Sequence, residues 1–190
     1  MFKRFTLLAC LFFLGTQAVS APAEYRLQKD QSRVGFVWFF GDDAITGEMP
    51  VARASIALDF DQPANSRINV AVDAAKARAG APLAGEAMKG QSVLWTDRFP
   101  EITFQSQTVR RDGAGGAVLT GRLTVRGVTQ PQTFTARLFR PAGAAPGDRS
   151  RLTIRLQGSL SRSAFGADGF SGMVGDTVTL DIQALIARVE

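Results

Sequence analysis

The feature of this sequence that most limits its fold is a strict alternation of apolar and polar residues on both sides of one short break. Leu123 and Val125 occupy odd positions before the break, and threonine and arginine fill the neighbouring even positions. After the connection at 127–131, the alternation resumes with Phe134 and Leu138 as apolar members. A period of two is typical of a half-buried strand, and two such runs across a connection with glycine and proline predict an antiparallel hairpin.

The same alternation recurs along most of the chain and predicts a fold made almost entirely of strands. Further alternating runs lie at 34–40, 56–60, 68–72, 102–104, 152–156 and 178–184. An antiparallel sheet with so many strands and one apolar face forms either a sandwich or a barrel, and closure into a barrel removes the exposed edges. We therefore expect an all-β fold, an antiparallel barrel of about eight strands, which has room for a small ligand.

Two segments depart from simple alternation. Residues 83–95 form the best helical candidate, and we expect this segment to cap one mouth of the barrel, with Met88 as a packing residue. The run at 34–40 carries Val37 and Phe39 opposite its main apolar face, so this strand is apolar on both sides near its end. Such a strand is either covered on its outer side or forms the lip of a ligand pocket.

The first residues of the chain have the features of a secretory signal peptide. A basic start precedes an apolar run at 5–14, and small or polar residues follow. The apolar run is shorter than the roughly 20 residues that a membrane-spanning helix needs. We therefore predict a cleaved signal peptide at 1–23 and one mature domain at 24–190. A retained membrane anchor and a lipid anchor at Cys10 are the alternatives.

The residue types that the chain lacks exclude several classes of function. Cys10 is the only cysteine and there is no histidine, so the mature domain is predicted to have no disulfide, thiol nucleophile, imidazole catalyst or zinc site built from these residues. Loss of Lys3 and Arg4 lowers the formal net charge from +5 to +3, and no run of basic residues indicates nucleic-acid binding. Asp42 and Asp43 are adjacent, and neighbours in a strand point to opposite faces. We predict no catalytic residues and no metal ligands.

Five stretches in register give the chain a resemblance to a known family. They are QSRVGFVW from Gln31, the hairpin at 56–72, RFPEITFQS from Arg98, GRLTVRGVTQP from Gly121, and SRSAFG from Ser161 with the following VGDTVTLDI. Together they resemble the YceI-like family of exported, lipocalin-like barrels over essentially the whole mature chain. The resemblance implies a long apolar ligand held inside the barrel, such as a polyisoprenoid, an isoprenoid quinone or a fatty amide.

The departures from the family's pattern concern polar residues. Gln31 stands where the family commonly has a histidine, and residues 84–88 read Ala-Gly-Glu-Ala-Met in place of Arg-Asp-x-His-Leu. Ala164 replaces an acidic residue, although Arg162 and Phe165 remain. These differences bear on the recognition of a polar head group more than on an apolar cavity.

Strand parity, together with the resemblance, predicts which side chains contact the ligand. The predicted ligand-binding residues are Val34, Phe36, Trp38, Ile56, Leu58, Val70, Phe104, Leu123, Val125, Phe134, Ile154 and Leu180. A register shift of one residue would turn the whole set of a strand outward, so each strand is a separate test. No cofactor is predicted, unless a bound isoprenoid lipid or quinone is counted as one.

The predicted role is that of a periplasmic binding or carrier protein for an apolar lipid, without enzymatic activity, acting as a monomer or weak homodimer. Transient contact with the inner membrane or with a membrane redox protein is expected, and binding to nucleic acid is not. Two alternatives stay open. One is an accessory protein of an envelope-stress or membrane-redox system that acts through protein contacts at Val37 and Phe39. The other is an enzyme that uses neither histidine nor cysteine.

Overall fold

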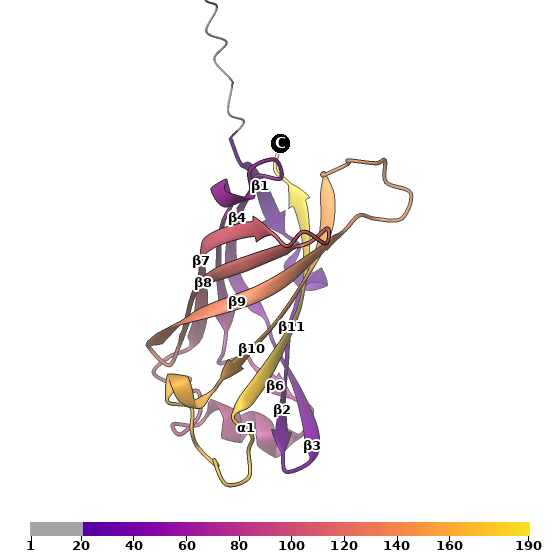
Figure 1. Ribbon diagram of the computed structural model, residues 1–190. Helices are drawn as coiled ribbons and strands as arrows, with labels where there is room; N and C mark the ends of the chain where they lie inside the picture. Colours follow the sequence, from indigo (N-terminus) through magenta and orange to yellow (C-terminus); the bar gives the residue numbers. More distant parts are fainter. Residues whose placement is uncertain (1–20) are drawn as a thin grey trace, which may run out of the picture.

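The computed structural model describes residues 21–190, which form one continuous antiparallel sheet (Figure 1). Residues 1–20, most of the expected signal peptide, lie outside the described part. The strands are β1 (Ala23–Leu27), β2 (Arg33–Phe40), β3 (Asp43–Met49), β4 (Val51–Leu58), β5 (Arg67–Asp73), β6 (Arg78–Ala79), β7 (Glu101–Arg111), β8 (Ala117–Val125), β9 (Val128–Phe139), β10 (Arg151–Ser161) and β11 (Thr177–Arg188). The helical elements are α1 (Pro82–Lys89) and the 3-10 turns η1 (Lys29–Gln31), η2 (Pro63–Asn65) and η3 (Ser163–Phe165). Within 21–190, no helix has the length and apolar character needed to cross a membrane.

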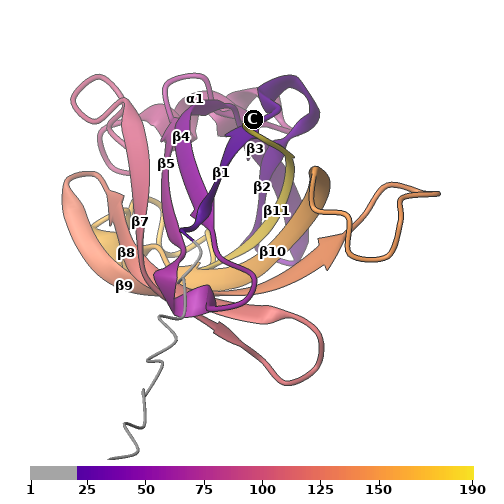
Figure 2. The same ribbon diagram turned by 90° about the horizontal axis from the view of Figure 1, so that it is seen from above.

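The sheet closes on itself because β1 pairs with two neighbours. Tyr25 of β1 lies opposite Ile56 of β4, and Leu27 lies opposite Ile186 of β11. A ring of eight strands results, in the order β1, β4, β5, β7, β8, β9, β10 and β11. β2, β3 and β6 extend the wall toward one end, since β2 also pairs with β11, and β3 pairs with both β2 and β6. Figure 2 shows the ring from the end at which β1 begins. The prediction of an antiparallel barrel of about eight strands is confirmed.

The β8–β9 hairpin is confirmed, but its turn is shorter than the sequence pattern indicated. Only Arg126 and Gly127 connect the two strands. Both have positive φ, 49° and 76°, as in the tight turns that suit the twist of a hairpin. The break expected at 127–131 is therefore wrong in extent. Pro131 lies within β9, at a part of the strand that precedes its ladder with β10 at Thr135, and proline is tolerated at such an edge.

The helix expected at 83–95 is shorter than predicted. α1 covers only Pro82–Lys89, and the chain after Gly90 folds back, so that the N–H of Leu94 donates to the carbonyl of Met88 at 3.0 Å. A proline in the first turn suits the start of a helix because its missing N–H would have no partner there. As expected, α1 lies at one end of the barrel, near the β2–β3 turn (Figure 1).

The connections between strands divide the barrel into two ends. We call one the helix end; it has α1 and the connections at 41–42, 126–127 and 162–176. We call the other the loop end; it has the connections at 59–66, 112–116 and 140–150. One cluster of buried residues, with Met88 and Phe165, lies toward the helix end, and a second, with Tyr25 and Leu152, lies toward the loop end. The barrel therefore has two packed regions and a wall that joins them.

Candidate ligand-binding cavity

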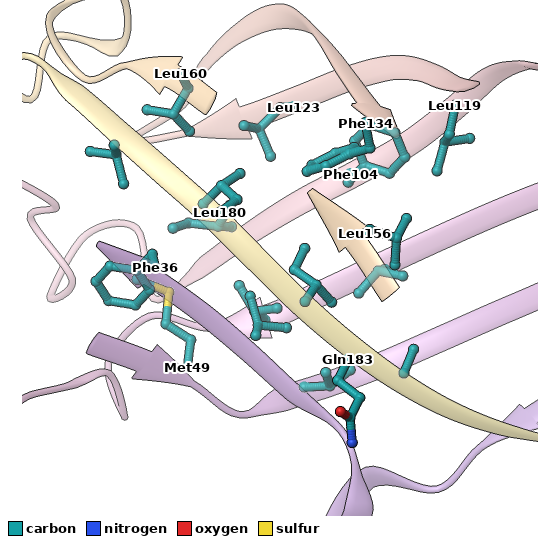
Figure 3. A pocket seen from close by; sticks show the side chains of 18 of the residues that line it. Phe36, Met49, Phe104, Leu119, Leu123, Phe134, Leu156, Leu160, Leu180 and Gln183 are labelled. Atoms are coloured by element: carbon teal, nitrogen blue, oxygen red, sulfur yellow. The ribbon is translucent and has the colours of Figure 1, made fainter. Parts of the chain in front are cut away.

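The barrel encloses a cavity of about 1030 Å³ that reaches from the helix end to the loop end. Met88 and Phe165 border it at the helix end, and Phe60 and Val109 border it at the loop end. Figure 3 shows phenyl, aliphatic and thioether side chains from several strands directed into this space. Ligand pockets in proteins commonly have volumes of about 300–1,000 Å³, so this cavity lies at the upper end of that range.

The structure places every predicted ligand-binding residue on the wall of this cavity. They are Val34, Phe36 and Trp38 on β2, Ile56 and Leu58 on β4, Val70 on β5, Phe104 on β7, Leu123 and Val125 on β8, Phe134 on β9, Ile154 on β10 and Leu180 on β11. The side of the sheet assigned to each residue from sequence parity is therefore correct. Contact of these side chains with a ligand stays a prediction.

Many of the inward side chains are only partly buried. Val70, Ile154 and Leu180 have intermediate exposure although they face the interior, whereas Leu123 and Phe134 are buried. In a close-packed core, inward side chains fill the space between opposite walls. Here they border a continuous cavity instead. The interior of the barrel is a lined space with packed regions toward its ends.

Two glycines let phenyl rings lie against the wall. A Cβ atom on Gly121 would lie 2.5 Å from the ring of Phe104, and one on Gly47 would lie 2.5 Å from the ring of Phe36. Side-chain atoms do not approach so closely, so each ring occupies space that only glycine leaves free. Phe104 also meets Phe134 edge-on, with ring centroids 5.3 Å apart. These contacts hold two large rings along the wall and leave the centre of the barrel open.

One polar side chain that the sequence pattern placed on the outer face also borders the cavity. In the alternating run at 178–184, Gln183 falls between the apolar Ile182 and Ala184, so a period of two puts it on the outer face, yet it lines the cavity among aliphatic residues (Figure 3). It lies where β11 changes partners: Gln183 pairs with Arg33 of β2, and Ile186 begins the pairing with Leu27 of β1. The pairing of β11 with β10 runs through Gln183 and Ala184 without a shift, so the change of partner affects only the other edge of β11. Its carboxamide can donate and accept hydrogen bonds, which suits a polar group on a ligand.

Arg162 organises the helix end and is itself only 7% exposed. Its guanidinium donates hydrogen bonds to the carbonyl oxygens of Gly175 at 3.0 Å, Gly169 at 2.8 Å and Val174 at 2.9 Å, and to that of Ala167. A buried guanidinium needs partners of this kind because all its polar groups are donors. Arg162 therefore holds the connection between β10 and β11 in place, and its donors serve the protein's own backbone.

Two arginines border the cavity at the loop end, and both are engaged with neighbouring connections. Arg111 donates to the carbonyl of Phe60 at 2.6 Å, and Arg137 forms an ion pair with Asp112 at 2.8 Å. The pKa of Asp112 is lowered first by backbone hydrogen bonds in its own turn, beginning with Ala114, and more weakly by Arg137. Asp112 is thus a structural acceptor that stays ionised.

The carboxylates at the helix end also serve turns. The N–H of Ser163 donates to Asp176 at 2.9 Å, and hydrogen bonds from Ser161 first, and then from Ser163, lower the pKa of Asp176. Asp42 and Asp43 are exposed at the β2–β3 turn. In the part of the chain that the structure describes, no group of three or more His, Cys, Asp or Glu residues could hold a metal ion. Asp176 therefore acts as a hydrogen-bond acceptor that supports the start of the connection between β10 and β11.

A closed antiparallel barrel with an apolar cavity along its axis defines the lipocalin-like class of fold. Within this class, the chain matches the YceI-like domain over residues 25–185 and belongs to the YceI-like family.

Relatives of known structure share the fold at low sequence identity. BcnA of Burkholderia cenocepacia superposes with a TM-score of 0.75 at 18% identity, covering 84% of this chain and 99% of that one. A polyisoprenoid binding domain from Saccharophagus degradans, implicated in plant cell wall breakdown, superposes with a TM-score of 0.64 at 12% identity, covering 88% and 99% of the two chains. In sequence, a UPF0312 protein of Pseudomonas putida strain GB-1 is 29% identical over 176 residues, which are 89% of this chain and 91% of the relative.

Proposed function

We propose that this protein binds one long apolar lipid, a polyisoprenoid or an isoprenoid quinone, along the axis of the barrel and acts as a periplasmic binding or carrier protein. The observation that carries the proposal is the cavity of about 1030 Å³ with aliphatic and aromatic walls. Transfer of apolar surface from water into such a cavity is favourable by roughly 25 cal/mol per Å². The fold neighbour described as a polyisoprenoid binding domain supports this class of ligand.

Selectivity for the ligand should come from the shape of the cavity more than from its polar groups. Gln183 is one polar side chain among aliphatic residues of the wall, and Arg111 and Arg137 at the loop end are engaged with the protein itself. The width available near Phe36 and Phe104 then limits how bulky the chain of the ligand is. A narrow, flexible hydrocarbon chain fits this description better than a rigid, highly charged molecule.

The proposed periplasmic location depends on removal of residues 1–23. Cleavage after Ala23 leaves Glu24 as the first residue, and the pairing of Tyr25 with Ile56 that helps to close the barrel is kept. The intact mass of the exported protein tests this processing. A mature species that retains Met1, or that carries an acyl group on Cys10, would place the protein on a membrane instead.

The most direct test of the proposed ligand is mass spectrometry of an organic extract from protein purified without detergent. We expect an isoprenoid lipid or quinone in an amount close to one per chain. Extraction of the same material after unfolding and refolding in lipid-free buffer provides the blank. An empty cavity after purification, together with no uptake of a long-chain polyprenol from detergent solution, would contradict the proposed function.

Ile154→Trp tests whether the bound lipid occupies the cavity. If opposite walls packed against each other at Ile154, the added indole would overpack the core and cost roughly 1–3 kcal/mol. Because Ile154 borders the cavity, the indole can occupy the space of the ligand. We expect delipidated Ile154→Trp to melt close to the delipidated wild type and to contain much less lipid.

Phe36→Ala provides the reciprocal change. It enlarges the cavity near the helix end, so the apo protein should be less stable, by about 3–5 kcal/mol for a large-to-small change in a packed region, and it should accept a bulkier chain. Unfolding of Ile154→Trp with unchanged lipid binding in the fraction that stays folded would show that lipid binds outside the barrel.

A further inference from the structure

The helix end carries a group of large apolar side chains on its surface. Phe39 and Phe40 lie at the end of β2, Leu83 lies on α1, and Phe170 and Met173 lie on the connection before β11, and all five are exposed. We call these five residues the apolar rim. Phe139 and Val189 are also exposed, but they lie at the loop end of the barrel. Exposed apolar groups of this kind mark surfaces that meet a protein, a ligand or a membrane.

The apolar rim is continuous with the cavity. Phe40, Leu83, Phe170 and Met173 border the cavity, so they form its mouth at the helix end. Phe39 follows Trp38 on β2 and points to the opposite face of the sheet, because successive residues of a strand alternate. Phenyl rings therefore lie on both the inner and the outer side of the wall at this mouth. A hydrocarbon chain that leaves the cavity here would meet apolar surface without a polar interruption at these residues.

Hydrogen bonds hold the segments of the rim together. Gly41 donates to the carbonyl of Met173, and Gly175 donates to the carbonyl of Phe39, both at 2.9 Å. Phe170 has φ of 61°, a left-handed conformation that is costly for a bulky residue. Strained residues persist where the surrounding structure fixes them, and they concentrate at functional sites. The backbone that carries Phe39 and Phe170 is therefore held in place, and their exposed rings lie on a fixed surface.

The charges around the rim indicate which kind of surface it fits. Asp42 lies in the turn after Phe40, Asp43 begins β3, and both are exposed. Lys89 of α1 pairs with Glu86 at 3.2 Å, and Arg126 donates to the carbonyl of Gly166, so these cations are occupied within the protein. Acidic tips beside exposed rings complement the ammonium groups of zwitterionic head groups and oppose anionic ones. Clusters of basic residues, by contrast, are attracted to anionic lipids.

We propose that the helix end is a membrane-docking surface, and that the apolar rim inserts into the interface of a zwitterionic phospholipid bilayer so that the mouth of the cavity opens onto its hydrocarbon region. This inference rests on the proposed function, because a docked mouth matters only if the cavity takes a lipid. Apolar side chains on a folded surface can enter the boundary between head groups and acyl chains, and the binding strength grows with the apolar area buried.

Phe39→Ser is the variant that tests docking, with Phe139→Ser as its matched control. The two residues are 48% and 47% exposed and lie near opposite ends of the barrel, and neither borders the cavity. Flotation with vesicles of phosphatidylethanolamine and phosphatidylcholine measures binding of the delipidated protein. We expect the wild type and Phe139→Ser to bind equally, and Phe39→Ser to bind roughly tenfold more weakly, because one buried phenyl ring changes a partition constant by about that factor or more.

A second variant guards against a local folding defect in β2. Leu83 is 86% exposed on α1, so Leu83→Ser should leave the barrel folded and weaken vesicle binding in the same direction. Circular dichroism and thermal melting show whether each variant is folded. Addition of phosphatidylglycerol to the vesicles should weaken binding of the wild type at low salt. Stronger binding to these anionic vesicles would overturn the assignment of a zwitterionic surface.

Uptake of a long-chain polyprenol from detergent micelles separates failure of docking from failure of the proposed function. Phe39→Ser should load from micelles as the wild type does, and load more slowly from vesicles. A wild type that loads from micelles but never floats with vesicles overturns docking and leaves lipid binding intact. A wild type that floats but never loads overturns the proposed function.

The rim could instead cover a second copy of the chain. Light scattering without vesicles would then find a dimer, Phe39→Ser would dissociate it, and docking would again be wrong.

Discussion

The two ends of the barrel use arginine in opposite ways. At the helix end, Arg162 is withdrawn from water and its guanidinium is surrounded by backbone carbonyl oxygens of the connection at 162–176. At the loop end, Arg149 stays partly exposed, pairs with Asp61 at 3.4 Å and lies 4.8 Å from the ring centroid of Phe60. A buried cation can fix a connection that has no ladder of its own, whereas an exposed one keeps its hydration and adds little.

Exposed phenyl rings at the two ends differ in their surroundings. Phe39 and Phe139 have nearly equal exposure, but Phe39 stands in a group of apolar residues at a cavity mouth. Phe139 has the guanidinium of Arg155 at 5.5 Å from its ring centroid, a common arrangement on a solvated surface. The comparison teaches that exposure alone does not identify a functional surface. The partners around an exposed ring, and its position relative to the cavity, decide its meaning.

The largest effect should come from Arg162→Met, which removes the donors that hold the helix end. One buried carbonyl oxygen, that of Ala167, and three part-buried ones would lose charged hydrogen-bond donors. Such losses cost about 1–3 kcal/mol for a buried group left unsatisfied. We expect Arg162→Met to lower the free energy of unfolding by at least about 3 kcal/mol, measured by urea denaturation.

Arg149→Met at the loop end is the matched control for that change. It removes an exposed ion pair and a cation–π contact, and it should cost less than about 1 kcal/mol. Equal destabilisation by the two variants would remove the distinction between the ends, because the burial of Arg162 would then contribute nothing.

An intermediate effect is expected from Gly121→Ala, in the wall between the two ends. The new methyl group would meet the ring of Phe104 and the carbonyl oxygen of Gln105, with Cβ at 2.5 Å and 2.3 Å from them. Overpacking of this kind costs about 1–3 kcal/mol, and the displaced ring would enter the cavity and reduce lipid uptake.

Gly172→Ala sharpens the comparison by placing the same change in the connection of the helix end. A Cβ on Gly172 would have no atom within 4 Å. The free energy of unfolding of Gly172→Ala should therefore stay within about 0.5 kcal/mol of the wild-type value. A large loss of stability from Gly172→Ala would show that close packing, and not the hydrogen bonds of Arg162, fixes this connection. Urea denaturation of both variants makes the measurement.

The wall of the cavity could be predicted from the sequence because the side of the sheet that each residue faces depends only on its neighbours in the strand. A period of two sets the side of each residue, and the sheet keeps that period along β2, β8 and β10. The same rule failed at Gln183, where the ladder passes from β2 to β1. The helix was predicted too long because its end depends on Gly90 and on the folding back of 91–97, which bonds to the backbone of α1. Local periodicity does not report such contacts.

The organisation of the helix end could not be predicted for a different reason. The partners of Arg162 are main-chain carbonyl oxygens at residues 167–175, and the types of side chain along that segment do not encode them. Similarly, Phe39 of β2, Leu83 of α1 and Phe170 of the connection before β11 are far apart in the sequence and form one surface only when the barrel closes. The sequence did indicate Phe39 as one face of a strand that is apolar on both sides. Its neighbours in space required the structure.

The smallest effect should appear in acid, where the carboxylates of the two ends can be compared. The pKa values of Asp112 at the loop end and Asp176 at the helix end are both lowered by hydrogen bonds in the folded protein. A carboxyl group whose folded pKa lies below its unfolded value, near 3.9, stabilises the fold above that value, and this contribution is lost as the pH falls through the folded pKa. Asp112→Asn and Asp176→Asn should therefore each melt slightly below the wild type at pH 7, and the melting temperatures should converge with that of the wild type below about pH 4.

Because Asp176 supports the segment next to Arg162, Asp176→Asn should also weaken vesicle binding at pH 7, whereas Asp112→Asn should not. Melting curves that stay separated in acid would assign the effect to altered packing, and equal vesicle binding by the two variants would mean that the rim does not depend on its supporting turn.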